Sequence, residues 1–171
     1  PLSKDDSLLY RVTGLARDTA NQVDFIKRER FSVAPALTWK PSEATSLTFL
    51  ASFQHDPKGE LPGYVPASGT VLPNPNGKLP VSFFSSEPDF SSVDRTQTVL
   101  GYLFEHRFND TWTVRQNFRY TKTDQYQSYL YLLGLESDLR TLDRYSYTDD
   151  ETATGYTLDN QLQARFITGP L

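Results

Sequence analysis

The sequence contains no cysteine, so disulfide bonds and thiolate metal sites are excluded. Long apolar runs are missing as well. The longest lies near Tyr129–Leu135 and falls short of the ~18 residues that a membrane-spanning helix requires. A helical membrane protein is therefore excluded. A transmembrane β-barrel is not, because barrel strands are hard to detect in overall hydropathy.

Hydrophobic residues are scarce, at 37% of the 171 residues, whereas aromatic residues are frequent, at 13%. The length is that of one domain. This combination is typical of a structure with a thin apolar face and a wet interior. The net charge of −4 argues against a general nucleic-acid binder, so we expect no nucleic-acid partner.

The stretch from Arg95 to Tyr131 has the clearest pattern, with two extended runs around an Asn109-Asp110-Thr111 turn. One face of these runs is apolar and carries Leu100, Tyr102, Phe104, Phe108, Trp112, Val114, Phe118 and Tyr120. The other face is polar and carries Arg95, Gln97, Glu105, Arg107, Thr113, Arg115, Asn117, Arg119 and Thr121. Alternation with a period of two predicts antiparallel strands. Their length, the large polar groups on one face and the aromatics beside the turn are typical of a transmembrane β-barrel.

Similar alternation predicts further strands at about Leu8–Arg17, Arg30–Lys40, Leu47–Gln54 and Gly155–Thr168. An extended segment from Arg140 to Thr148 precedes the last strand. We expect Asp149-Asp150-Glu151 to break the chain between this segment and the last strand. Pro35 lacks a backbone N–H, so we expect a bulge or local fraying there.

The connections are expected to alternate between long and short, as in outer-membrane barrels. Alternation stops from Pro57 to Val93, where most prolines and glycines fall, and a moderate loop is expected near Asp18–Glu29. Aromatic residues at the short-turn ends would form an interfacial girdle. These residues are Trp39, Phe108, Trp112 and Phe166.

The chain begins with Pro1 rather than Met and has no signal peptide, so we expect an interior part of a longer protein. The six expected strands are too few to close a wide barrel, which favours the same interpretation.

Several short motifs follow one another along the chain. They are Leu37-Thr38-Trp39-Lys40-Pro41, Ser46-Leu47-Thr48-Phe49, Gly69-Thr70, Pro75-Asn76-Gly77-Lys78-Leu79-Pro80, Gly101-Tyr102, Glu105-His106-Arg107-Phe108-Asn109-Asp110, Thr113-Val114-Arg115-Gln116-Asn117 and Leu158-Asp159-Asn160-Gln161-Leu162-Gln163. Together they resemble the TonB-dependent ferric-siderophore receptors, above all the ferrichrome-type hydroxamate receptors and their pyoverdine-type relatives. The resemblance covers essentially all 171 residues.

This resemblance implies an all-β, antiparallel transmembrane barrel of about 22 strands, of which residues 1–171 would supply about six long ones. It also implies a plug domain inside the barrel, absent here like the remaining strands, and energy delivered by TonB. The expected location is the outer membrane of a Gram-negative bacterium, with membrane lipid around the barrel. The expected ligand is a ferric siderophore of the hydroxamate type. Its iron arrives chelated, so neither a cofactor nor a metal ligand is expected from the protein.

Ligand contacts are expected from aromatic residues of the loops. In ferrichrome-type receptors an aromatic residue that follows a glycine faces the ligand, and Gly63-Tyr64 matches that place. The aromatic pair at the tip of the next hairpin resembles Tyr129 and Tyr131. Further candidates are Phe83, Phe84, Phe90 and Tyr126. Such rings could grip a siderophore by burial and stacking, or pack only on one another.

The chain departs from the ferrichrome-type pattern in two places. Glu136-Ser137-Asp138 stands where that type carries cysteine, and Pro62 stands where it carries another aromatic residue. The identity of the siderophore therefore stays open.

Arginines on the polar face could attract an anionic iron complex, although bridges to carboxylates of a plug are favoured. They are Arg11, Arg115, Arg119 and Arg165. Asp149-Asp150-Glu151 could hold Ca²⁺, but it lacks the spacing of a calcium loop, and a solvated loop is favoured.

Other functional classes find less support. The histidine–acid neighbours His55-Asp56 and Glu105-His106 would point to opposite faces of a strand, so no enzyme is expected. A passive porin and a soluble β-sheet binding module remain as alternatives.

Overall fold

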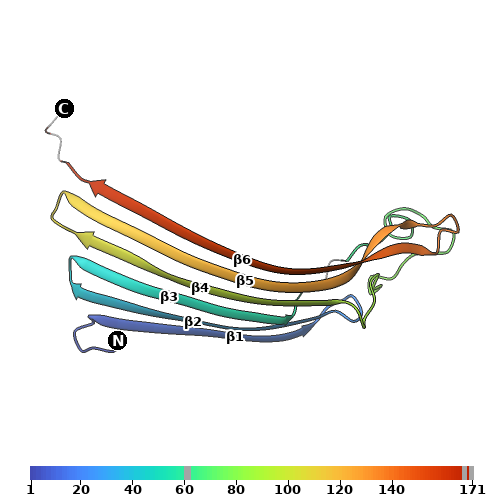
Figure 1. The fold of residues 1–171 in the computed structure, drawn as a ribbon, viewed down its shortest axis with the longest axis horizontal. Helices are drawn as coiled ribbons and strands as arrows, with labels where there is room; N and C mark the ends of the chain where they lie inside the picture. Colours follow the sequence, from blue (N-terminus) through green and yellow to red (C-terminus); the bar gives the residue numbers. More distant parts are fainter. Residues whose placement is uncertain (60–62, 167–168, 170–171) are drawn as a thin grey trace.

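A computed structural model describes residues 1–59, 63–166 and 169, and these residues form one six-stranded antiparallel sheet (Figure 1). The strands are β1 (Leu8–Ala20), β2 (Lys27–Ser42), β3 (Thr45–Lys58), β4 (Ser92–Arg107), β5 (Trp112–Leu135) and β6 (Leu142–Ala164). Each strand pairs with its neighbour in sequence, so the order in the sheet is β1-β2-β3-β4-β5-β6. The predicted all-β antiparallel class is confirmed.

Within the described ranges, no helix is long and apolar enough to cross a membrane.

The connections divide the sheet into two ends. The connections at 43–44 and 108–111 define the turn end, and those at 21–26, 59–91 and 136–141 define the loop end. Figure 1 shows these two sets at opposite ends of a long, curved sheet. The long connection expected between Pro57 and Val93 is therefore confirmed. The connection after β5 was expected to be long and is instead a short turn, because β5 and β6 continue as a paired hairpin beyond the other strands.

β6 runs without a break through Asp149-Asp150-Glu151, so the predicted interruption is wrong. These three residues pair in register with Gln127, Tyr126 and Gln125 of β5. Side chains leave a strand perpendicular to the sheet, so acidic ones do not disturb the backbone ladder. The predicted end of the last strand at Thr168 lies outside the described residues, as does Ile167, and β6 ends at Ala164.

No bulge occurs at Pro35, because Pro35 pairs with Val12 of β1 in unshifted register. Toward β3 the pairing skips Ala34 and Pro35 and then resumes in the same register, so the ladder is interrupted only on that side. A strand residue directs its N–H toward one neighbour, so a proline weakens one ladder and leaves the other intact. The register shifts of this strand pair lie near its two ends, at Glu29/Phe31 and Trp39/Ser42.

The sheet has one apolar and one polar face, as the alternation predicted. One row of register partners on the apolar face consists of Tyr10, Leu37, Phe49, Tyr102, Phe118 and Leu158. The adjacent row on the polar face consists of Leu9, Thr38, Thr48, Leu103, Asn117 and Asp159. The threonines of this row share a hydrogen bond of 2.9 Å, and Asn117 donates to Asp159 over 3.3 Å.

The four aromatics expected to form a girdle are all at the turn end and exposed. Phe108 and Trp112 flank the turn between β4 and β5, where the Phe108 N–H donates to the Trp112 carbonyl over 3.0 Å. The rings of Trp112 and Phe166 meet edge to face at 6.0 Å. Trp39 is 50% exposed near the end of β2. Their predicted positions are confirmed.

Buried side chains occur at the loop end. Among the described residues they are Ile26, Asp56, Pro66, Ser85, Ser86, Ser128 and Tyr129. Toward the turn end both faces of the sheet are open, so the strands there are joined by their ladders and by side-chain pairs within each face. A partly enclosed surface that could bind a ligand therefore forms at the loop end of the described sheet.

Candidate functional site

Five tyrosines pack together on the hairpin that β5 and β6 form at the loop end. This tyrosine cluster consists of Tyr64, Tyr129, Tyr131, Tyr145 and Tyr147. Tyr129 pairs in register with Tyr147, and Tyr131 with Tyr145, with ring centroids 5.1 and 5.4 Å apart. Tyr64 arrives from the 59–91 segment and lies 4.5 Å from the Tyr131 ring and 6.2 Å from the Tyr129 ring. Rings at these separations attract one another beyond simple burial.

Three of the predicted ligand contacts, Tyr64, Tyr129 and Tyr131, therefore meet at one place. Tyr145 and Tyr147 were missed, because the expected break after Thr148 hid the long pairing of β6 with β5. The Tyr-Ser-Tyr alternation was the signal that could have revealed them. Tyr129 is 8% exposed, so the other rings offer most of the accessible aromatic surface.

The other predicted aromatics do not join the cluster. Phe84 contacts Phe25 of the β1–β2 connection, with ring centroids 5.8 Å apart. Phe83 and Phe84 line a separate, mostly apolar cavity of about 540 Å³ together with Val65 and Leu79. Tyr126 belongs to the opposite, apolar face of β5 and pairs in register with Asp94 and Asp150. Phe90 contributes a carbonyl oxygen to the hydrogen bonding described next.

Hydrogen bonds fasten the 59–91 segment to the hairpin beneath the tyrosine cluster. Ser128 is 2% exposed, and its hydroxyl donates to the Phe90 carbonyl over 2.5 Å. The Leu130 N–H donates to the Ser86 hydroxyl over 2.7 Å, and the Ser86 hydroxyl also bonds to that of Ser91 at 2.6 Å. Buried polar groups that are satisfied in this way hold one specific arrangement, since an unpaired group would be costly.

A second set of bonds fastens the same segment to the tip of the hairpin. Asn74 donates to the Leu139 carbonyl over 2.8 Å, and Asn76 donates to the Asp138 carbonyl over 3.1 Å. The Asp138 carboxylate caps the tip, accepting from the Thr141 hydroxyl and from the N–H groups of Thr141 and Arg140. These bonds lower the pKa of Asp138 to about 2, the Thr141 hydroxyl contributing most.

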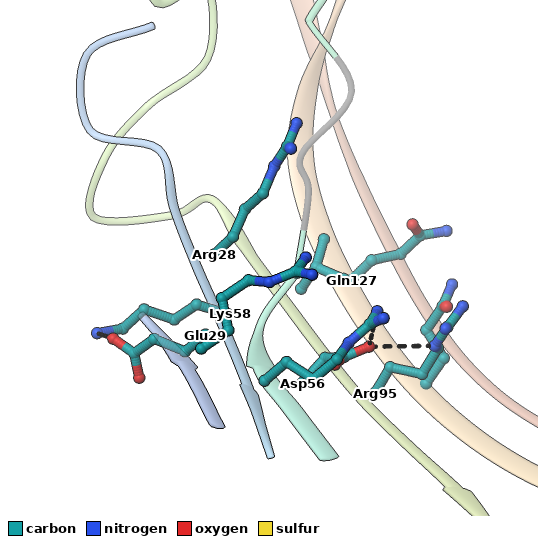
Figure 2. Close-up of a pocket in the computed structure, with 11 residues that line it drawn as sticks. Arg28, Glu29, Asp56, Lys58, Arg95 and Gln127 are labelled. Carbon is teal, nitrogen blue, oxygen red and sulfur yellow. Dashed lines mark hydrogen bonds and ion pairs between the residues drawn. The ribbon is translucent and has the colours of Figure 1, made fainter. Parts of the chain in front are cut away.

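A basic pocket of about 390 Å³ lies at the loop end of the sheet (Figure 2). Its lining includes Arg17, Arg28, Glu29, Arg30, Asp56, Lys58, Arg95, Gln125 and Gln127. Asp56 is 4% exposed. It accepts two bonds from Arg30, at 2.6 and 3.0 Å, and one from Gln54 at 2.9 Å, and the Arg95 Nε lies 3.6 Å away. The buried carboxylate thus holds two guanidinium groups at the floor of the pocket.

The basic pocket and the tyrosine cluster share one face of β5. Gln125, Gln127 and Tyr129 alternate along that strand, so neighbouring members of the series are about 7 Å apart. One ligand of siderophore size could therefore contact both. Sequence reasoning missed the pocket, because its cationic residues come from four different strands and form no motif.

The arginines expected on the polar face behave differently from those in the pocket. Arg115 bonds to Glu105 at 2.5 Å and donates to the Gln163 side chain over 2.9 Å. It lines an open cavity at the turn end together with Arg107 and Arg165. Arg115 is therefore engaged within the wall, far from the tyrosine cluster.

In the described part of the chain, no group of three or more His, Cys, Asp or Glu side chains could hold a metal ion. The neighbours His55 and Asp56 separate onto opposite faces, as expected. His55 lies 3.1 Å from Asp94, and the His106 Nδ1 lies 2.8 Å from the Thr45 hydroxyl.

Comparisons with known proteins agree with this architecture. Residues 36–169 match the family model described as TonB dependent receptor-like, beta-barrel. The chain is 36% identical to a ferrichrome outer membrane transporter/phage receptor of Escherichia coli K12, over 99% of the chain and 25% of that protein. It is 36% identical to a ferrioxamine receptor of Yersinia enterocolitica, over 91% of the chain and 21% of that protein.

A solved structure is also similar. The crystal structure of the ferric-catecholate import receptor Fiu of Escherichia coli K12, in its open form, superposes with a TM-score of 0.74. The sequence identity is 26%, and the match covers 96% of the chain and 28% of Fiu. The chain thus spans about a quarter of the length of the relatives that it matches.

Proposed function

The chain belongs to the TonB-dependent receptor β-barrel family, and on that premise we propose that the whole protein takes up a ferric siderophore of the hydroxamate type. Two relatives named for ferrichrome and ferrioxamine, at 36% identity each, support this ligand class. The expected location, the outer membrane of a Gram-negative bacterium, is confirmed by the family and by a relative named as an outer membrane transporter. The family argues against a passive porin.

Within the whole protein, residues 1–171 form one section of the barrel wall, while a plug domain and the other strands complete the domain. Energy for transport comes from TonB acting on the plug. The apolar face meets lipid, as in other transmembrane barrels. The relatives are about four times as long as the chain, which leaves room for these parts.

The family consists of receptors and transporters, and the absence of enzymatic activity remains a prediction. Iron enters only inside the siderophore, so the protein supplies neither a metal ligand nor a cofactor. Recognition then depends on the organic shell of the siderophore.

The observation that carries the proposal is the tyrosine cluster, because it gathers three predicted contacts on the polar face. Tyr64, Tyr129 and Tyr131 grip the apolar backbone of the ligand, while Phe83 and Phe84 shape the neighbouring cavity. Tyrosine rings suit this role, since each provides a broad apolar surface and a polar hydroxyl.

The test is siderophore binding by the full-length receptor in detergent. Tyr64→Ala and Tyr131→Ala should each weaken binding of a ferric hydroxamate about fivefold or more, because stacking and burial each contribute around 1 kcal/mol. Tyr126→Ala is the matched control, since Tyr126 lies on β5 but on the apolar face. Parent affinity in both tyrosine variants would refute the proposed contacts.

A further inference from the structure

Among the described residues that line the basic pocket, cationic side chains outnumber anionic ones. Five cationic side chains (Arg17, Arg28, Arg30, Lys58 and Arg95) and two anionic ones (Glu29 and Asp56) line it, which leaves a net charge of +3. The whole chain, by contrast, carries a net charge of −4. Cations are therefore concentrated at this place against the overall balance of the protein.

Three of these cations share the two carboxylates of the lining. Arg30 donates two hydrogen bonds to the Asp56 carboxylate, and the Arg95 Nε lies 3.6 Å from the same carboxylate. Lys58 bonds to Glu29 at 2.6 Å, and Figure 2 shows this pair directed away from Asp56. Arg30 and Arg95 share the single carboxylate of Asp56, so their two guanidinium groups retain capacity for a further anion.

The geometry of the pocket suits a carboxylate. A guanidinium group presents parallel N–H donors that match the two oxygens of a carboxylate. Asp56 positions Arg30 and Arg95 beside each other, which lowers the entropy lost when a ligand binds. The neighbouring Gln125 and Gln127 offer amide groups for further hydrogen bonds.

A ligand held by the tyrosine cluster would need a second group to contact this pocket. A ferric trihydroxamate core is electrically neutral, because three hydroxamate anions balance Fe³⁺, so only an additional group can give the complex a charge. Tyr131 and Gln127 lie four residues apart on the same face of β5, so a core held by Tyr64 and Tyr131 would place such a group about 13 Å away, next to Gln127.

We propose that the basic pocket binds a carboxylate carried by the siderophore outside its iron core, so that the receptor favours anionic ferric hydroxamates over neutral and cationic ones. This inference rests on the proposed function and specifies its substrate. The same chemistry could be supplied by a carboxylate of a protein segment inside the barrel, and the experiment separates the two sources.

The test uses one linear trihydroxamate chelator in three forms, with its terminal amine free, acetylated or succinylated. The ferric complexes are then cationic, neutral and anionic overall, with the same core. Binding to the full-length receptor in detergent should be about tenfold tighter for the anionic complex than for the neutral one, as expected for a hydrogen-bonded charge pair. The cationic complex should bind least tightly.

Arg17→Gln and Arg95→Gln should each remove most of the preference for the anionic complex and leave the affinity for the neutral complex nearly unchanged. Arg30 stays in place in both variants, so Asp56 keeps its two strongest bonds. Arg107→Gln is the matched control, since it removes the same charge at the turn end. It should leave the preference intact.

Equal affinities for the three complexes in the parent receptor would overturn the inference. So would a uniform loss of binding for all three complexes in Arg17→Gln and Arg95→Gln, because that pattern indicates pairing with a protein carboxylate. If no ferric trihydroxamate binds the parent at all, the proposed function itself fails, and this result is distinct from the other two.

Discussion

At the turn end of the sheet the strands are open on both faces, whereas the loop end, with its connections, contains the buried side chains of the chain's described part. The turn end is a regular wall with one apolar and one polar face. The loop end joins the long β5–β6 hairpin to the 59–91 segment through buried hydroxyls and backbone groups. Figure 1 shows the hairpin and that segment side by side, beyond the shorter strands.

The two regions thus rely on different interactions. The wall has no core of its own and depends on its surroundings, with lipid against the apolar face and the barrel interior against the polar face. The loop end contains its own specific contacts and can hold the tyrosine cluster in one arrangement. Removing the surroundings should therefore damage the wall, and removing single hydroxyls should damage the loop end.

The largest effect is expected when the wall loses its surroundings altogether. The side chains of the apolar face, such as Phe49 and Leu158, are exposed. In addition, β1 and β6 each present one unpaired edge in this six-stranded sheet. We expect a polypeptide of residues 1–171 to self-associate in water without detergent, as measured by light scattering. A monodisperse monomer with a sharp, concentration-independent unfolding transition would contradict the assignment of the wall.

A smaller effect distinguishes the two faces of the wall. Phe104 and its partner Leu47 belong to the apolar face, whereas Thr113 and its partner Arg107 belong to the polar face. Phe104→Arg in the full-length protein should cost about 2–4 kcal/mol of unfolding free energy in lipid. Thr113→Arg should cost much less. Equal costs in folding measurements would mean that the faces are wrongly assigned.

Packing within the wall is tested by a glycine pair. A Cβ atom at Gly101 would lie 2.5 Å from the Phe118 carbonyl oxygen of the neighbouring strand, whereas one at Gly155 would meet nothing within 4 Å. Gly101→Ala should therefore destabilise the barrel by about 1–3 kcal/mol, because β4 and β5 must separate to make room. Gly155→Ala serves as the control, and a similar stability of both variants in urea would rule out the close approach.

The loop end is tested by removing one buried hydroxyl. Ser128→Ala leaves the Phe90 carbonyl without its donor, and the attachment of the 59–91 segment should weaken by about 1–2 kcal/mol. Limited proteolysis of that segment should become about tenfold faster or more. Ser46→Ala, in the wall, should change neither rate nor stability. Unchanged proteolysis of Ser128→Ala would show that the hydroxyl does not hold the segment.

The smallest effect concerns acid and the hairpin tip. The pKa of Asp138 is lowered to about 2, above all by the Thr141 hydroxyl, so its carboxylate stabilises the tip at pH values above its ordinary pKa of 3.8. This contribution is lost as the pH falls from about 4 toward 2. Hydrogen exchange at the Thr141 amide should speed up in that window. Asp138→Asn should abolish the pH dependence, and its persistence would assign it to another group.

Several features followed from the sequence alone. Alternation in the Arg95–Tyr131 stretch fixed antiparallel strands, their faces and the turn at Asn109, because a period of two is a local property of extended chain. The aromatic residues at the turn end were found in the same way. Tyr64, Tyr129 and Tyr131 were selected by resemblance, and their meeting at one place agrees with that choice.

Other features were decided only by the tertiary structure. Asp149-Asp150-Glu151 resembles a loop in sequence, but it is held in β6 by register pairing with β5, a contact between residues distant along the chain. The partners Tyr145 and Tyr147 were hidden for the same reason. The basic pocket gathers Arg17, Arg95 and the buried Asp56 from separate strands. No local pattern encodes such a convergence, because it depends on the register of strands that the turns and the long hairpin bring together.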